Sequence, residues 1–227
     1  MMGNVLFMRK GETHAAPLTG VSLADIAEGS IVKINENGSP VEFYVAKHDY
    51  ESGLNGTGRT LLVRKNLHST QKWGSNNVYS TSAIDTWFNG TYKALLDAEV
   101  QNAIGTTKFY CNPGNGATNT NRVTTYSRAV FTVSTDEVGE AFSSMVKNAE
   151  GSALPVASTI LIGYLNGTAT RYWTRSPASG SSEAYEILAS GSCTSAGVGN
   201  TFGARPCFTL PSTALFDEET LEFKGVA

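Results

Sequence analysis

The chain has 227 residues, 41% of them hydrophobic and 16% charged, which is enough for one folded domain with a substantial core and argues against disorder. The formal net charge of -3 leaves no basic stripe to follow a phosphate backbone, so nucleic acid is not the expected partner. Three cysteines, at positions 111, 193 and 207, are too few for a disulfide scaffold and favour a reducing compartment, while a single Cys193–Cys207 bridge stays open.

Residues 1–20 carry no sustained hydrophobic period, and we expect them to form an N-terminal arm for attachment or oligomerisation. Their apolar stretch ends at the basic pair Arg9-Lys10 after a few residues. This is too short for a membrane helix and does not match a signal peptide. We therefore expect neither a signal peptide nor insertion into a membrane.

Residues 30–48 predict a β-hairpin. Apolar and polar side chains alternate over residues 41–45, and the preceding Asn37-Gly38 dipeptide favours a two-residue turn. A further strand candidate follows at residues 59–65, with the sequence RTLLVRK.

The hydrophobic period changes between residues 80 and 104. Apolar residues from Ile84 to Leu96 recur at helical spacing, and Ser82 stands where it can cap the first turn. The Asn89-Gly90 pair is expected to divide this stretch into two short helices.

Residues 129–134, AVFTVS, predict another strand. Ser134 and Glu137 then have the spacing of a capping box, which predicts that a second helical region starts there, with Glu137 as a favourable charge at the helix end. Residues 143–170 fit a strand or a short helix equally well.

The last third of the chain has a different composition, because small residues dominate from 173 to 205. One strand candidate interrupts them at residues 183–190, in which Tyr185 and Ile187 share a face. The sequence PCFTL then predicts a closing strand, and residues 213–227 form an acidic C-terminal tail that we expect to be solvated.

Residues suited to catalysis are scarce. The three histidines, His14, His48 and His68, have no metal-ligand spacing to another histidine or to a cysteine, and no phosphate-binding loop or nucleophile elbow occurs. Cys193 and Cys207 as a copper-binding or redox thiol pair remain an alternative. We expect no metal, no cofactor and no enzymatic activity.

Two arginines stand out in this weakly charged region. Arg175 and Arg205 each lie near a proline, and a guanidinium group in such a segment commonly donates to carbonyls or to a carboxylate inside the protein. We expect both to hold the loop region together from within. The residues with expected structural roles are Trp87, Trp173, Arg175 and Arg205.

The ordered stretches STSAIDTWFNGTYKALLD, YLNGTATRYWTRSP and FGARPCFTLPS carry a resemblance over about residues 21–212. They resemble an uncharacterised C-type-lectin-like domain family of Gram-positive gut bacteria and their prophages, with a Trp-Trp-Leu-Arg-Ser-Pro motif and a terminal Gly-Val-Arg-Pro-Ala strand. That family is related in fold to the formylglycine-generating enzyme and to diversified phage receptor-binding proteins. The resemblance implies an α+β, C-type-lectin-like fold with short twisted antiparallel sheets, two or so helices and a long irregular loop region.

The branches of that fold differ in what they require. Calcium-dependent sugar binding needs a Glu-Pro-Asn or Gln-Pro-Asp cluster that this chain lacks, and the oxidase branch needs two closely spaced cysteines. The branch of phage receptor-binding proteins needs only a rigid base and a surface patch between the tryptophan and the Arg-Pro strand. The resemblance places in that patch a mixture of tyrosine and small polar residues typical of adaptable binding surfaces: Ser179, Ser181, Ser182, Tyr185, Ser192, Thr194, Asn200 and Phe202.

The sequence therefore favours a non-enzymatic virion protein of a phage or prophage, from the tail fibre or tip, that binds a host cell-surface glycan or protein. We expect a homo-oligomer, with a trimer favoured, because many copies strengthen weak contacts. Other virion proteins are expected partners, and the location is the virion after assembly in the bacterial cytoplasm. The alternatives are a formylglycine-generating-type thiol oxidase and a purely architectural virion component without a ligand.

Overall fold

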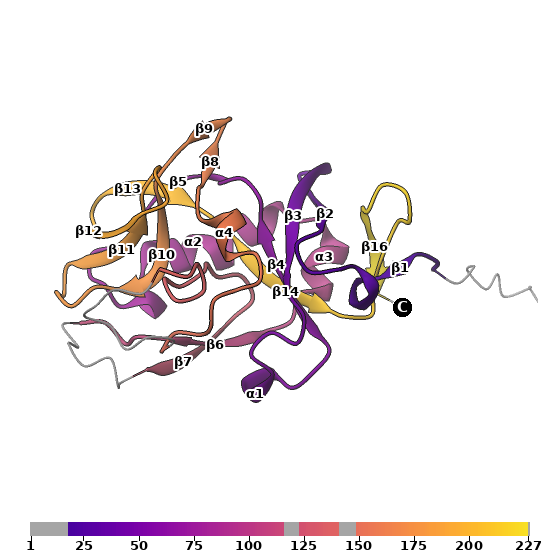
Figure 1. Cartoon of the computed structure of the whole chain (residues 1–227), viewed down its shortest axis with the longest axis horizontal. Coiled ribbons are helices and arrows are strands. Elements are labelled where there is room, and N and C mark those ends of the chain that lie inside the picture. The colour runs from indigo at the N-terminus through magenta and orange to yellow at the C-terminus, as the bar shows by residue number, and fades with distance from the viewer. Residues whose placement is uncertain (1–17, 116–122, 141–148, 227) are drawn as a thin grey trace, which may run out of the picture.

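The computed structural model describes residues 18–115, 123–140 and 149–226, and within these ranges the chain is mainly β (Figure 1). Sixteen strands form five sheets, whereas the longest single α-helix has six residues. The expected α+β, C-type-lectin-like fold is therefore wrong. Its long irregular loop region, residues 173–205, is largely built of paired strands, because backbone hydrogen bonds between strands do not require large side chains.

A four-stranded sheet in the order β14-β4-β3-β2 forms one half of the core. The predicted hairpin is confirmed: β2 (Ile31–Glu36) and β3 (Ser39–Lys47) pair antiparallel. Asn37 and Gly38 both have positive φ, at 51° and 70°, as a two-residue hairpin turn requires. The strand predicted at 59–65 is β4 (Arg59–Arg64), and the closing strand β14 (Cys207–Pro211) pairs with it.

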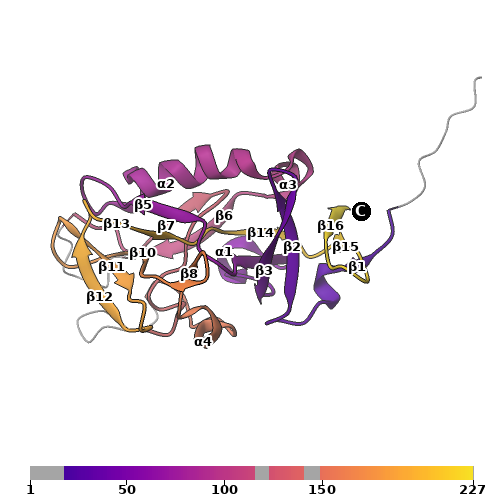
Figure 2. The ribbon, with the colours of Figure 1, turned by 90° about the horizontal axis from the view of Figure 1, so that it is seen from above.

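A five-stranded sheet in the order β12-β11-β10-β13-β5 forms the other half, at the left of Figures 1 and 2. Its strands are β5 (Ser69–Lys72), β10 (Tyr172–Pro177), β11 (Glu183–Ile187), β12 (Cys193–Gly197) and β13 (Thr201–Ala204). Strand β13 runs parallel to β10 and antiparallel to β5. Because β5 precedes β13 by more than a hundred residues, only distant parts of the chain complete this sheet.

Three small sheets complete the fold. Strands β6 (Thr107–Cys111) and β7 (Thr124–Arg128) form one pair, and β8 (Tyr164–Leu165) and β9 (Thr168–Ala169) another. The third sheet joins β1 (Val21–Ser22), β15 (Ala214–Phe216) and β16 (Phe223–Val226). The segment expected to be a solvated acidic tail thus contributes two strands, while most of the expected N-terminal arm, residues 1–17, lies outside the described ranges.

The main helical stretch comprises α2 (Ala83–Trp87), the π-helical turn η3 (Phe88–Tyr92) and η4 (Lys93–Leu95), and α2 lies along β5 (Figure 2). Ser82 caps it as predicted, since its Oγ accepts from Asp85 N at 3.1 Å. The predicted division at Asn89-Gly90 is wrong, because helical backbone continues through both residues. Asn89 instead donates from its side chain to the carbonyls of Asp85 and Val130.

The other helices are short: η1 (Leu23–Asp25), α1 (Ser52–Asn55), η2 (Tyr79–Thr81), α3 (Ala98–Ala103) and α4 (Ala157–Ile160). Helix α4 and the β8–β9 pair occupy the described part of the ambiguous segment 143–170, whose first residues, up to 148, lie outside the described ranges. In the ranges that the structure covers, no helix combines the length and the apolar character needed to cross a bilayer.

The predicted strand at 129–134 forms only an isolated bridge, between Phe131 and Cys207. The capping-box contacts do form, with Ser134 Oγ accepting from Glu137 N at 3.1 Å and Glu137 Oε2 accepting from Ser134 N at 2.9 Å. However, residues 135–139 make turns, so the predicted helix is absent from the described part of this region. Glu137 is fully buried and therefore does not serve as the expected charge at a helix end.

Candidate functional site

Arg175 on β10 lies at the centre of a buried polar cluster. Its Nη1 and Nη2 donate to Glu137 Oε2 and Oε1 at 2.5 and 2.9 Å, and both side chains are inaccessible to solvent. Further donations reach the carbonyls of Tyr110 at 3.0 Å, Thr132 at 2.9 Å and Glu150 at 2.8 Å. One guanidinium group therefore ties β6, the segment after β7 and the turn near residue 150 to β10.

The charges of this cluster are compensated. Burial lowers the pKa of Arg175, but Glu137, Tyr50 and Glu150 together outweigh burial, and the pKa lies well above its usual value. Burial also raises the pKa of Tyr50, whose hydroxyl donates to Glu137 Oε1 at 2.5 Å. The guanidinium group lies 4.9 Å from the ring centroid of Phe109 and 5.9 Å from that of Phe131. The paired Arg175 and Glu137 side chains, with their further hydrogen bonds, fix the geometry of the surrounding loops.

Arg205 is also fully buried, as expected from the sequence, but it uses neutral partners. It donates to the carbonyls of Ile160, of Ile162 at 3.1 Å and of Lys65 at 3.5 Å. Its guanidinium carbon lies 4.4 Å from the ring centroid of Tyr172. Burial lowers the pKa of Arg205, and no carboxylate compensates it within the described residues.

A third internal anchor, Asn77, was not anticipated from the sequence. Its buried side-chain Nδ2 donates to the carbonyls of Ala178 at 3.0 Å, Gly180 at 2.5 Å and Glu183 at 2.9 Å. The backbone N–H of Asn77 donates to Ser181 O at 3.2 Å. The serine-rich turn between β10 and β11 is thus held from beneath by one residue from a distant loop.

Above these anchors, one face of the five-stranded sheet presents a row of mixed side chains. Trp173 pairs with Glu186 on β11, and Glu186 pairs with Thr194 on β12, so these three side chains point to the same face. Arg171 and Phe202 lie on this face too, because each is one residue removed from the paired residues Tyr172 and Gly203. We call this side of the sheet the Arg171 face: Arg171, Thr194 and Phe202, which are at least partly exposed, and Trp173 and Glu186, which are buried between them.

The Arg171 face contains an incompletely satisfied carboxylate. Glu186 is 2% exposed, and its Oε1 meets Arg171 Nη1 at 3.4 Å, while Oε2 has no hydrogen-bond partner among the described residues. Burial raises the pKa of Glu186, and Arg171 lowers it by a smaller amount. Arg171 is half exposed and lies 5.0 Å from the Phe202 ring centroid, and Phe202 in turn stacks on Trp173 at 4.6 Å. A polar ligand could reach the guanidinium group of Arg171 and the hydroxyl of Thr194, whereas the Glu186 carboxylate is buried beneath them.

The structure separates the residues that the sequence placed in a single patch. Thr194 and Phe202 lie half-buried on the Arg171 face. The exposed residues lie in turns, at one end of the β11–β12 hairpin or the other: Ser179, Ser181, Ser182 and Asn200 at one end, and Ser192 at the opposite end. Tyr185 was wrongly placed at the surface, since it is only 5% exposed.

Tyr185 shares a face of the sheet with Ile187, and it is buried because both faces of β11 are covered from Ala184 to Ile187. The large aromatic contact area that the sequence assigned to the patch is consequently absent there. Of the other residues expected to have structural roles, Trp173 is fully buried, whereas Trp87 is half-buried and its ring centroid lies 5.3 Å from that of His68.

The cysteines give no support to a thiol site. Cys111, Cys193 and Cys207 are all free, so the Cys193–Cys207 bridge is not formed. Burial raises the pKa of Cys193 to about 12 and raises that of Cys207 well above its usual value, which disfavours the reactive thiolates. In the described residues no three histidine, cysteine, aspartate or glutamate side chains gather closely enough to hold a metal ion.

Comparison with known proteins gives one match. The family model described as "Domain of unknown function (DUF6273)" matches residues 57–212, from just before β4 to just after β14, and so includes the whole five-stranded sheet. No curated protein and no solved structure matches the chain.

Proposed function

The chain belongs to the DUF6273 family, and we propose that it is a receptor-binding protein of a phage or prophage virion, of the tail fibre or tip, which uses the Arg171 face and the adjoining serine-rich turns to bind a host cell-surface glycan or protein. The observation that carries this proposal is the division between a fixed interior and a polar surface. Arg175, Arg205 and Asn77 are buried and hydrogen-bonded, whereas the turns above them carry small exposed side chains.

This division suits binding more than catalysis. A rigid base lowers the entropy lost when a ligand binds, and small polar side chains on turns accommodate changes without disturbing the core. On the Arg171 face, the half-exposed guanidinium group of Arg171 and the hydroxyl of Thr194 lie on either side of Glu186. Hydroxyl groups of a glycan, or polar groups of a surface protein, match these donors and acceptors.

The test is binding of the fluorescently labelled full chain to intact Gram-positive gut bacteria, before and after chemical removal of wall polysaccharide or protease treatment of the cells. We expect Thr194→Lys to reduce binding about tenfold, because it places a bulky cation next to Glu186, in the space that a ligand would occupy. Thr213→Lys is the matched control, because Thr213 is exposed and lies between β14 and β15, outside the five-stranded sheet.

Loss of binding after polysaccharide removal would identify a glycan receptor, and loss after protease treatment a protein receptor. Equal binding by Thr194→Lys, Thr213→Lys and the unchanged chain would refute the proposed face. If labelled protein bound none of the cells, a role as an architectural virion component would replace receptor binding.

A further inference from the structure

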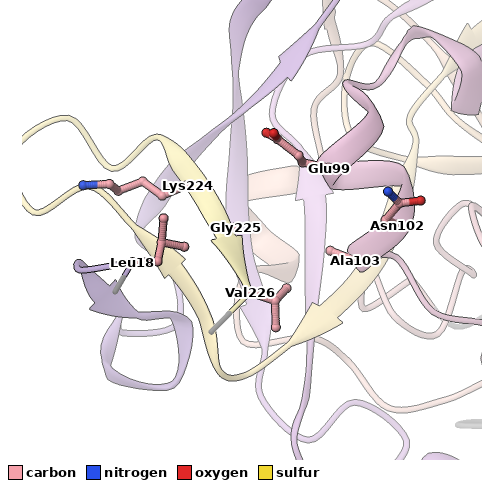
Figure 3. A pocket seen from close by; sticks show the side chains of 7 residues that line it. All are labelled: Leu18, Glu99, Asn102, Ala103, Lys224, Gly225 and Val226. Carbon is pink, nitrogen blue, oxygen red and sulfur yellow. The ribbon is translucent and has the colours of Figure 1, made fainter. Parts of the chain in front are cut away.

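A groove lies between helix α3 and strand β16, at the end of the molecule opposite the Arg171 face (Figures 1 and 3). It has a volume of about 470 Å³ and is open to solvent. Its lining combines a small apolar floor with a few polar groups: Leu18, Glu99, Asn102, Ala103, Lys224, Gly225 and Val226. The strand that borders it, β16, is the edge of its three-stranded sheet.

The apolar residues of this groove are unusually exposed. Leu18 is 43% and Val226 42% exposed, and they are two of the three large hydrophobic residues with marked exposure among those described. Both side chains line the groove, and Leu18 packs against Gly225, the neighbour of Val226, where an added Cβ atom would come within 2.9 Å of Leu18 Cδ2. Adjacent exposed apolar side chains beside an edge strand are typical of an interaction surface.

The charged residues beside the groove indicate which kind of partner binds there. Glu99 projects from α3 on one side and Lys224 from β16 on the other (Figure 3). Lys224 has only a long contact of 3.6 Å with Asp217, and Glu99 forms no ion pair within the described residues. One patch therefore carries an apolar centre flanked by opposite charges. Such a patch is complementary to itself when a copy is rotated by 180°.

We propose that this groove is the interface of a two-fold homodimer, in which Leu18 and Val226 of each copy meet across the axis and Glu99 of each copy pairs with Lys224 of the other. A two-fold arrangement replaces the trimer expected from the sequence, because a single patch supplies both members of each charge pair. Leu18 and Val226 are the exposed large apolar side chains at the groove, so the interface buries less apolar surface than a stable dimer, and we expect a weak dimer that dissociates on dilution.

The proposed interface does not depend on the proposed receptor binding. It uses chain ends that lie outside residues 57–212, together with α3, which lies inside the family match. Because the groove and the Arg171 face lie at opposite ends, a dimer would leave both Arg171 faces free. Two linked binding faces would increase the avidity for a repetitive surface.

The test is the mass of the purified full chain, measured by light scattering and by sedimentation over a range of concentrations. We expect twice the chain mass at high concentration and the chain mass on dilution. Val226→Asp is expected to weaken the dimer at least about tenfold, because it places a charge in the apolar centre. Thr213→Asp, at an exposed turn outside the groove lining, is the matched control and should leave the dimer unchanged.

Charge exchange tests the two-fold arrangement itself. Glu99→Lys and Lys224→Glu should each weaken self-association about tenfold, because two like-charged pairs replace two attractive ones. A mixture of these two variants should form a heterodimer, since both of its charge pairs are again opposite. Circular dichroism of each variant checks that it is folded. A mass equal to one or three chains at every concentration, or a mixture that fails to associate, would overturn the proposal.

Discussion

Glu137 and Arg175 form a bidentate ion pair at 2.5 and 2.9 Å, although 38 residues separate them and neither side chain is accessible to solvent. The pair is stable inside the protein because the Tyr50 hydroxyl and the Ser134 backbone N–H also donate to the Glu137 carboxylate, and carbonyls supply acceptors for the guanidinium group. Its function is to position the loops that support β10. It is not exposed to a substrate, so its loss is expected to show first in stability.

Glu137→Gln should lower the free energy of unfolding by about 3–5 kcal/mol, because it leaves the buried guanidinium group without its counter-charge. Urea denaturation of the variant and of the unchanged chain measures the difference. Glu218→Gln, at an exposed position in the β15–β16 turn, is the matched control and should change stability by less than about 0.5 kcal/mol. If Glu137→Gln lowered the free energy of unfolding no more than Glu218→Gln does, the ion pair would contribute nothing to stability.

Arg175→Met and Arg205→Met should lower the free energy of unfolding by different amounts, although both remove a fully buried guanidinium group. The first leaves the Glu137 carboxylate buried without a counter-charge, while the second leaves only neutral carbonyls unpaired. We expect Arg175→Met to lower the free energy of unfolding by at least about 2 kcal/mol more than Arg205→Met does. The difference is measured from the denaturant midpoints, provided that the two variants show the same dependence of this free energy on denaturant concentration. The reverse order would mean that Arg205 is the more important anchor.

Asn77→Ala should loosen the serine-rich turn without unfolding the protein. Three side-chain hydrogen bonds to Ala178, Gly180 and Glu183 are lost, for a cost of about 1–3 kcal/mol. Exchange of backbone amide hydrogens should become faster at residues 178–183. It should stay unchanged in β3, because none of these three hydrogen bonds involves a residue of β3. Asn76→Ala removes one exposed contact to Val78 and serves as the control. Unchanged exchange at 178–183 would contradict the anchoring role.

Glu186 should make stability depend on pH. Burial raises the pKa of Glu186 in the folded state, so the unfolded chain loses this proton first as the pH rises. Folding is therefore penalised above the ordinary pKa of the carboxyl group, and Glu186→Gln removes that penalty. The stability of the variant relative to the unchanged chain should increase between about pH 4 and about pH 7. Glu183→Gln, at an exposed position of the same strand, is the control, and a difference independent of pH would refute this account of Glu186.

The free thiols should be unreactive in the folded protein. Burial raises the pKa of Cys193 to about 12, and Cys207 and Cys111 are fully buried with raised pKa values. Alkylation with iodoacetamide at neutral pH should therefore be slow until denaturant is added, after which all three cysteines react. Reducing agent should leave the melting temperature unchanged, and a large decrease would indicate a disulfide.

Local signals in the sequence were enough to predict the β2–β3 hairpin and the start of helix α2. Asn37-Gly38 fits a turn that requires positive φ at both residues, and Ser82 can cap a helix with no information from elsewhere in the chain. The burial of Arg175 and Arg205 was likewise predictable, because a guanidinium group in an apolar, proline-bounded segment needs many acceptors. Their partners were not predictable, since Glu137 resembles an ordinary capping residue.

The five-stranded sheet could not be predicted from local patterns. Gln71 pairs with Phe202 across 131 residues, and β12 contains mainly small residues without a clear alternation. Tyr185 is a different case, because its shared face with Ile187 was visible and should have indicated burial. Asn77 had no signal, since its role depends entirely on a turn that lies about a hundred residues away.

The late position of β13 and β14 affects how the protein is made. Strand β5 meets its partner only after residues 201–204 have been synthesised, and β4 acquires its second neighbour only with residues 207–211. A nascent chain therefore leaves the ribosome with both large sheets incomplete until residues 201–211 have been translated. Prematurely terminated products would keep unpaired strand edges, which makes them substrates for proteases and chaperones rather than competitors for assembly.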